Sequence, residues 1–256
     1  MSQETTKMNT YTWMARIVGV LFIIGTAAGI LSLGFLGDVV GAPDLGKIAA
    51  EKDQVLIGVL LLFTMAAACA GTTIWLYPVL KKYSEGLALG AVCFRLVEGV
   101  LGMAGAVSLL VLLTLSQEFV KAGAPDASYF QTLSVLLVTG HDWVANGPMI
   151  LAWCTAALMY YYVFYQTKLI PRWLSVWGLI GIVLSIAATM LVMFGVFDSM
   201  NAIDSLMNLP ILVQEMVMAI WLIVKGFSPA AIASLSARAD GGVAIPVKPK
   251  VQGDKA

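Results

Sequence analysis

The stretch QVLIGVLLLFTMAAACAGTTIWLYPVL, from Gln54 to Leu80, contains no charged residue. About 20 consecutive apolar residues are enough for a helix to cross the hydrocarbon core of a bilayer. Five further stretches have the same character, and between them they contain only three charged residues: residues 17–37, 86–117, 143–167, 173–197 and 206–224. We therefore predict an all-α integral membrane bundle of six transmembrane helices.

The composition agrees with this prediction and excludes several other classes of protein. Of the 256 residues, 60% are hydrophobic and 12% are charged, about half the charge that a soluble domain carries. The 15 basic and 15 acidic residues leave no excess positive charge for binding nucleic acid. One histidine is too few for a multi-histidine metal site, and we expect no metal and no cofactor. The three cysteines lie in apolar runs, where we expect small buried side chains.

The chain divides into a six-helix membrane domain, residues 1–227, and a tail, residues 228–256. The tail is rich in Ala, Ser, Gly, Pro and Lys, which favours a solvated, disordered extension. The run GHDWVANGP, residues 140–148, interrupts the fourth apolar region, because Gly and Pro weaken or end a helix. We expect residues 129–139 to form a separate segment, interfacial or leaning on the bundle, and the fourth span to begin near Asn146.

The distribution of basic residues predicts the orientation. With the N-terminus inside, the inner segments contain 11 Lys and Arg residues and the outer loops contain 3. Because cytoplasmic loops of membrane proteins are enriched in Lys and Arg, we expect both termini to be cytoplasmic. We expect a multi-pass protein of the inner (plasma) membrane, with membrane lipid as one partner.

Three ionisable residues, Arg95, Glu98 and Glu215, lie deep in the apolar stretches. Arg95 and Glu98 are three residues apart, so they share a helix face, which continues in the small residues Gly102 and Gly105. At 1.5 Å per residue from the inner ends of their helices, the three groups lie ~14, ~18 and ~15 Å deep. We expect Glu215 to pack against Arg95, with Gln214 nearby. Since one arginine cannot neutralise two carboxylates, either a glutamate is protonated or a second cation joins the site.

These charges have two interpretations. They form either a buried lock that fixes how the helices pack, or a polar site that binds a ligand or a proton; charged residues inside a membrane favour a functional role. His141 and Asp142 stand just before the fourth span and Asn146 lies at its start; these residues are either polar groups at a helix end or ligand contacts. Two GxxxG patterns, Gly25–Gly29 and Gly86–Gly90, indicate close helix packing, within the bundle or, alternatively, in a homo-oligomer.

Four runs together resemble one known family. They are RIVGVLFIIGTAAGILS (residues 16–32), FRLVEGVL (94–101), LIPRWLSVWGLIG (169–181) and QEMVMAIWLIVKGF (214–227). The chain resembles, over about residues 14–230, the bacterial and archaeal membrane proteins catalogued as domain of unknown function 4386. The resemblance implies a polytopic prokaryotic membrane protein and no particular reaction.

Three functions fit these patterns. The first is binding or transport of a small or lipidic molecule at a pocket formed by Arg95, Glu98, Gln214 and Glu215, with His141, Asp142 and Asn146 as further ligand contacts. The second is a non-catalytic membrane partner, sensory or assembly component, which would contain no internal cavity. The third is a membrane enzyme that uses Glu98, Glu215 or the His141–Asp142 pair as acid and base; it requires a cavity that reaches both levels.

Overall fold

A computed structural model describes residues 2–41, 43–123, 128–199 and 201–239. All secondary structure in these residues is helical, in the order α1 (Ser2–Gly41), α2 (Leu45–Ala50), α3 (Lys52–Leu80), α4 (Glu85–Lys121), α5 (Ser128–Ala145), α6 (Pro148–Thr167), α7 (Arg172–Met193), α8 (Ala202–Val224) and α9 (Pro229–Ala239). Six candidate spans are long and apolar enough to cross a membrane, and α5 with α6 forms one of them. The all-α six-span prediction is confirmed, and the chain has the architecture of a multi-pass membrane protein.

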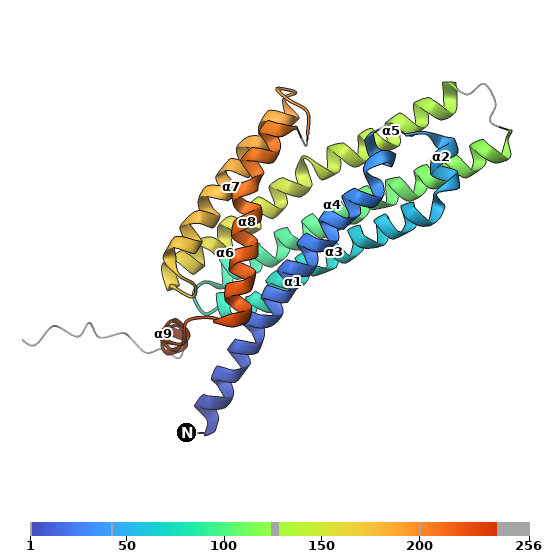
Figure 1. The fold of residues 1–256 in the computed structure, drawn as a ribbon. Helices are drawn as coiled ribbons and strands as arrows, with labels where there is room; N and C mark the ends of the chain where they lie inside the picture. Colours follow the sequence, from blue (N-terminus) through green and yellow to red (C-terminus); the bar gives the residue numbers. More distant parts are fainter. Residues whose placement is uncertain (1, 42, 124–127, 200, 240–256) are drawn as a thin grey trace, which may run out of the picture.

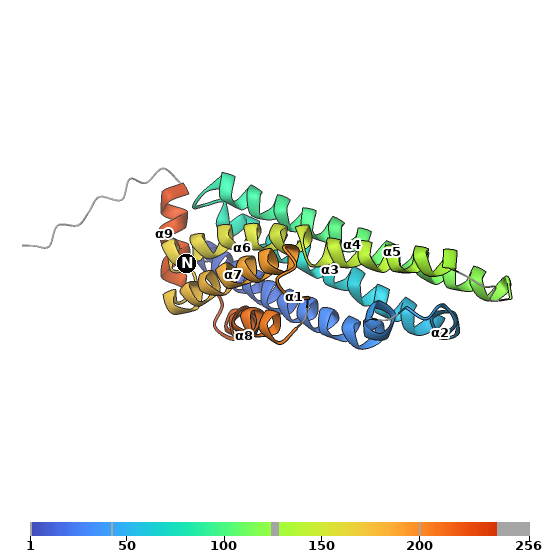
Figure 2. The same cartoon turned by 90° about the horizontal axis from the view of Figure 1, so that it is seen from above.

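The helices form two groups that meet at one end of the molecule (Figure 1). Helices α1, α3, α4 and α5 lie side by side as a long layer, whereas α7 and α8 pack as a pair and diverge from that layer. Helix α6 contacts both α4 and α7 and so joins the groups. Helix α9 lies across the end where the two groups meet (Figure 2). We call this end the α9 end and the opposite end the α2 end.

The interruption of the fourth apolar region is confirmed. Helix α5 ends at Ala145 and α6 begins at Pro148, a residue that is tolerated at the first position of a helix because it lacks a backbone N–H. Helix α5 is longer than the predicted segment 129–139 and leans on the bundle. It packs along α4 and buries Ser134 and Val138.

Glycines allow the closest helix contacts. A Cβ placed on Gly19 of α1 would lie 2.6 Å from the carbonyl oxygen of Ala219 on α8. One placed on Gly29 would lie 2.9 Å from Met65 Sδ on α3, and one on Gly25 would lie 3.5 Å from Cys69 Sγ. Both glycines of the first GxxxG pattern therefore serve packing inside the bundle, the first of the two alternatives.

Residues 229–239 correct the prediction of a disordered tail. They form α9, which buries Ala231, Ile232 and Leu235 in the apolar cluster at the α9 end. Lys82 Nζ donates a 2.7 Å hydrogen bond to Ser236 Oγ on this helix. The small apolar stripe on α9 gives it a surface to bury, so the helix packs on the bundle. Residues 240–256 of the predicted tail lie outside the described residues.

Buried apolar side chains form two separate clusters. One lies at the α9 end and contains Tyr160, Tyr161 and Phe164 of α6 among its largest members. The other lies toward the α2 end, where Leu36 of α1 and Leu109 of α4 are buried. Along α4, Arg95 and Glu98 lie between the residues that belong to the two clusters. The apolar core is therefore interrupted at the level of this charged pair.

Candidate functional site

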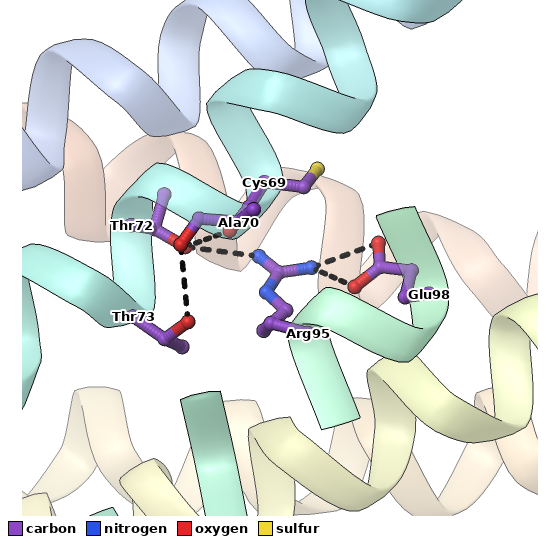
Figure 3. Close-up of polar contacts among 6 residues, drawn as sticks. All are labelled: Cys69, Ala70, Thr72, Thr73, Arg95 and Glu98. Carbon is purple, nitrogen blue, oxygen red and sulfur yellow. Dashed lines mark hydrogen bonds and ion pairs between the residues drawn. The ribbon is translucent and has the colours of Figure 1, made fainter. Parts of the chain in front are cut away.

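An ion pair on α4 forms the polar centre of the molecule (Figure 3). Arg95 Nη1 donates hydrogen bonds of 3.0 and 2.8 Å to the two carboxylate oxygens of Glu98. The residues are 2% and 9% exposed. Their spacing of three places both on the buried face of α4, as the sequence predicted, and a charge-assisted pair at this distance neutralises much of the cost of burial.

Helix α3 supplies a further contact to the guanidinium group. Arg95 Nη2 lies 3.4 Å from Thr72 Oγ1, and the Thr72 hydroxyl donates a 2.7 Å hydrogen bond to the carbonyl oxygen of Cys69 (Figure 3). The Phe22 ring of α1 lies 6.0 Å from the guanidinium carbon, within cation–π range. Arg95 Nε is buried and has no hydrogen-bond partner among the described residues, so this donor of Arg95 is unused.

A cavity of about 420 Å³ borders this ion pair. Its walls come from α1, α3, α4, α5, α6 and α8. The small residues Gly102 and Gly105 of α4 line it, as do Gly25 and Gly29 of α1. A Cβ placed on Gly102 would lie 3.2 Å from Met149 Sδ, and one on Gly105 would lie 3.3 Å from His141 Nδ1, so these glycines let the helices that form the cavity wall approach closely.

Glu215 of α8 lines the same cavity as Arg95 and Glu98. The three groups expected at one depth therefore meet at one cavity. The expected pairing of Glu215 with Arg95 is wrong, because the salt bridges of the described residues join Arg95 to Glu98 only. Glu98 lies on the same helix and within reach of Arg95, whereas Glu215 approaches from another helix. Glu215 Oε1 is buried, and no described residue forms a hydrogen bond with it.

Gln214 does not line the cavity. Its amide nitrogen donates a 3.0 Å hydrogen bond to the carbonyl oxygen of Leu174, and its amide oxygen accepts a 2.6 Å hydrogen bond from the Tyr161 hydroxyl. The side chain is 0% exposed and links α8 to α6 and α7. We therefore correct the expectation that Gln214 joins the charged cluster, and assign it to packing.

The residues at the α5–α6 junction separate into two surroundings. His141 and Asn146 line the cavity, and His141 Nδ1 lies 3.0 Å from the carbonyl oxygen of Gly105. Asp142 does not line it; it borders a smaller pocket of about 120 Å³, together with Asn146 and Met193. The cavity therefore reaches from the Arg95 level to the α5–α6 junction, but it excludes Asp142.

The cysteines occupy three different surroundings. Cys154 is buried, as predicted, whereas Cys69 is half-buried and lines the cavity. Cys93 is exposed, so the prediction of a buried thiol is wrong at that position. Within the described ranges, no group of three or more His, Cys, Asp or Glu side chains could hold a metal ion.

Several residues of the site carry no signal in the sequence. Thr72 supports Arg95, Phe22 packs on it, and Trp153 and Thr26 line the cavity. Aromatic and hydroxyl side chains of this kind occur throughout apolar helices, so only the helix packing shows which of them face the charges.

Comparison with known proteins places the chain in a family. A family model described as "Domain of unknown function (DUF4386)" matches residues 17–226. The chain belongs to the DUF4386 family. The resemblance found in the sequence is confirmed. No curated protein matches the chain, and no solved structure matches it.

The DUF4386 segment contains the whole cavity. The first and last residues that line it, Leu21 and Glu215, both fall within the matched range, whereas α9 lies beyond it. The charged cluster, His141 and Asn146 thus lie within the segment that the family model matches.

Proposed function

We propose that the protein binds a small or lipidic molecule in the intramembrane cavity. The observation that carries this proposal is a cavity of about 420 Å³ next to a buried carboxylate oxygen of Glu215 for which the described part of the chain supplies no hydrogen-bond partner. The volume falls within the range of ligand pockets, roughly 300–1,000 Å³. Buried polar atoms without partners are rare in folded proteins, and a bound molecule would supply the partner.

The charge balance of the site suggests the chemistry of the ligand's polar end. Glu98 already pairs with Arg95, and the cavity wall holds a second carboxylate, Glu215, which forms no ion pair with any residue that the structure describes. A buried carboxylate is stabilised by an opposite charge or by a hydrogen-bond donor. We therefore expect the ligand to place a cationic or hydrogen-bond-donating group against Glu215.

The shape of the bundle suggests how a lipidic molecule enters. Ile30 and Leu33 of α1 and Leu212 of α8 line the cavity and are also exposed on the outside of the bundle. Helices α1 and α8 touch at Gly19 near the α9 end and separate toward the α2 end (Figure 1). We infer that the cavity opens laterally between these helices, toward the face that lipid would cover.

The other two functions receive less support. A non-catalytic membrane partner, sensory or assembly component would contain no internal cavity, whereas this bundle contains one. The enzyme reading required a cavity that reaches both levels; the cavity borders Glu98, Glu215 and His141, but Asp142 faces elsewhere. Our proposal keeps the inner (plasma) membrane location and the cytoplasmic termini expected from the sequence.

Native mass spectrometry of protein purified in mild detergent tests the proposal. Wild type is compared with Glu215→Leu, which removes the carboxylate from the cavity wall, and with Glu85→Leu, which removes an exposed carboxylate elsewhere, on α4. We expect a bound molecule in wild type and in Glu85→Leu, and its loss from folded Glu215→Leu. If all three proteins carry only the same nonspecific lipid, the charged cluster is a packing lock.

A further inference from the structure

A second pocket, of about 540 Å³, lies at the α9 end. It is formed by the turn between α6 and α7 and by the linker between α8 and α9. The backbone N–H of Ser228 donates a 2.9 Å hydrogen bond to the carbonyl oxygen of Leu169 and ties these segments together. Leu169 and Phe227, which line the pocket, are buried, so its base is part of the packed core.

Among the described residues, three cations and no acidic residue line this pocket. They are Lys168, Arg172 and Lys225, one from each of three consecutive helix ends. None of the three forms an ion pair within the part of the chain that the structure describes. The Arg172 guanidinium lies 5.2 Å from the Tyr165 ring centre, a contact that leaves its N–H donors free for an anion.

Lys168 is held at the pocket by the backbone. It ends α6 with φ 58° and ψ 32°, in the left-handed region, and its N–H donates a 2.9 Å hydrogen bond to the carbonyl oxygen of Phe164. Within the described residues it is the one non-glycine position with a positive φ. The conformation turns the chain sharply between α6 and α7, which brings Lys168 and Arg172 to the same pocket.

The pocket lies where a bilayer surface would be. It borders the ends of three candidate spans, α6, α7 and α8, and Trp221 lines it while Trp173 follows directly after Arg172. Tryptophan is enriched at the boundary between hydrocarbon and headgroups. Basic pockets between membrane helices at this level suit anionic lipid headgroups.

We propose that Lys168, Arg172 and Lys225 form a binding site for a phosphate group, supplied by the headgroup of an anionic phospholipid. The site is separate from the intramembrane cavity and does not depend on the function proposed for it. The guanidinium and ammonium groups bind the phosphate oxygens, and the acyl chains lie along the apolar helix faces beside the pocket.

The same end of the molecule offers a matched control. Arg16, Lys81 and Arg238 carry the same total charge but line none of the pockets described above. Each lies over an aromatic ring: Arg16 over Trp13, Lys81 over Tyr77 and Arg238 over Tyr83. A general attraction of a basic surface to anionic lipid would depend equally on both sets of cations.

The test measures how much phosphatidylglycerol and phosphatidylcholine the protein retains in native mass spectrometry. Wild type, the pocket triple variant K168Q/R172Q/K225Q and the control triple variant R16Q/K81Q/R238Q are compared after confirming by circular dichroism that each is folded. We expect wild type and the control to retain more phosphatidylglycerol than phosphatidylcholine. In the pocket variant, the ratio of the two retained lipids should fall by at least about tenfold. If the triple variant does not fold, the single variants K168Q and K225Q are measured in its place. Each should show a smaller decrease in the ratio of retained phosphatidylglycerol to phosphatidylcholine.

Three outcomes would overturn the proposal. One is an equal loss in the two triple variants, which would show only a general attraction to a basic surface. Another is equal retention of the two lipids by wild type. The third concerns the source of the phosphate: if inorganic phosphate displaces phosphatidylglycerol from wild type at low millimolar concentration, the site serves a soluble phosphate compound and the lipid assignment is wrong.

Discussion

Replacing Arg95 by Met removes the cation from a cavity wall that holds two carboxylates, and we expect it to destabilise the protein more than Glu98→Gln does. Glu98 and Glu215 would then remain near each other without a positive charge. Removing one member of a buried ion pair costs about 3–5 kcal/mol of unfolding free energy, and we expect Arg95→Met to fall in this range.

Glu98→Gln is expected to cost less. The guanidinium group keeps its contact with Thr72 and still has Glu215 across the cavity as a counter-charge. The loss is then close to that of one charge-assisted hydrogen bond, about 1.5–3 kcal/mol. Because Arg95 and Glu98 contact each other directly, the double variant should cost about 1–3 kcal/mol less than the sum of the single variants.

Unfolding by sodium dodecyl sulfate in mixed micelles, followed by tryptophan fluorescence, measures these free energies. The exposed residues Arg16 and Glu85 provide charge-matched controls, Arg16→Met and Glu85→Gln, each expected to change stability by no more than about 0.5 kcal/mol. The reasoning is refuted if Arg95→Met costs no more than Glu98→Gln, or if the double variant equals the sum of its parts.

Three further changes test the packing of the bundle by thermal unfolding in detergent. Gly19→Ala should lower the melting temperature, because its Cβ would lie 2.6 Å from a backbone oxygen of α8 and overpacking costs about 1–3 kcal/mol. Gly34→Ala is the control: a Cβ at Gly34 has no described atom within 4 Å, so this variant should leave the melting temperature unchanged or raise it. Gln214→Leu should cost about 1–3 kcal/mol, since it leaves the Tyr161 hydroxyl without its partner, and an unchanged melting temperature would contradict the packing role. Leu235→Ser should cost about 1.5–3 kcal/mol if α9 packs on the core, and no loss would show that α9 does not contribute.

The features that depend on local geometry could be predicted from the sequence. The charge-free stretch from Gln54 to Leu80 corresponds to helix α3, Lys52–Leu80, because length and apolar character alone define a span. Arg95 and Glu98 pair as their spacing of three requires. The common level of these residues and Glu215 also follows from the rise per residue, and the three residues line one cavity.

The features that depend on how helices rotate against each other could not be predicted. Gln214 and Glu215 are adjacent, so their side chains point about 100° apart around α8; one faces α6 and α7 and the other faces the cavity. The sequence does not indicate which of the two side chains faces the cavity. Helix α9 was missed for a different reason, because its apolar face consists of few residues, among them Ile232 and Leu235, in a segment rich in Ala and Ser.

The central claim is that a molecule occupies the intramembrane cavity. Its most direct test is to fill the cavity with a larger side chain and to measure the mass of any molecule that the protein retains. Thr26 of α1 lines the cavity, and Thr64 of α3 is exposed and does not. Native mass spectrometry of Thr26→Phe, Thr64→Phe and wild type would show a retained molecule in wild type and Thr64→Phe and its loss from folded Thr26→Phe. Retention of the same molecule by Thr26→Phe, or of none by wild type, would contradict the account.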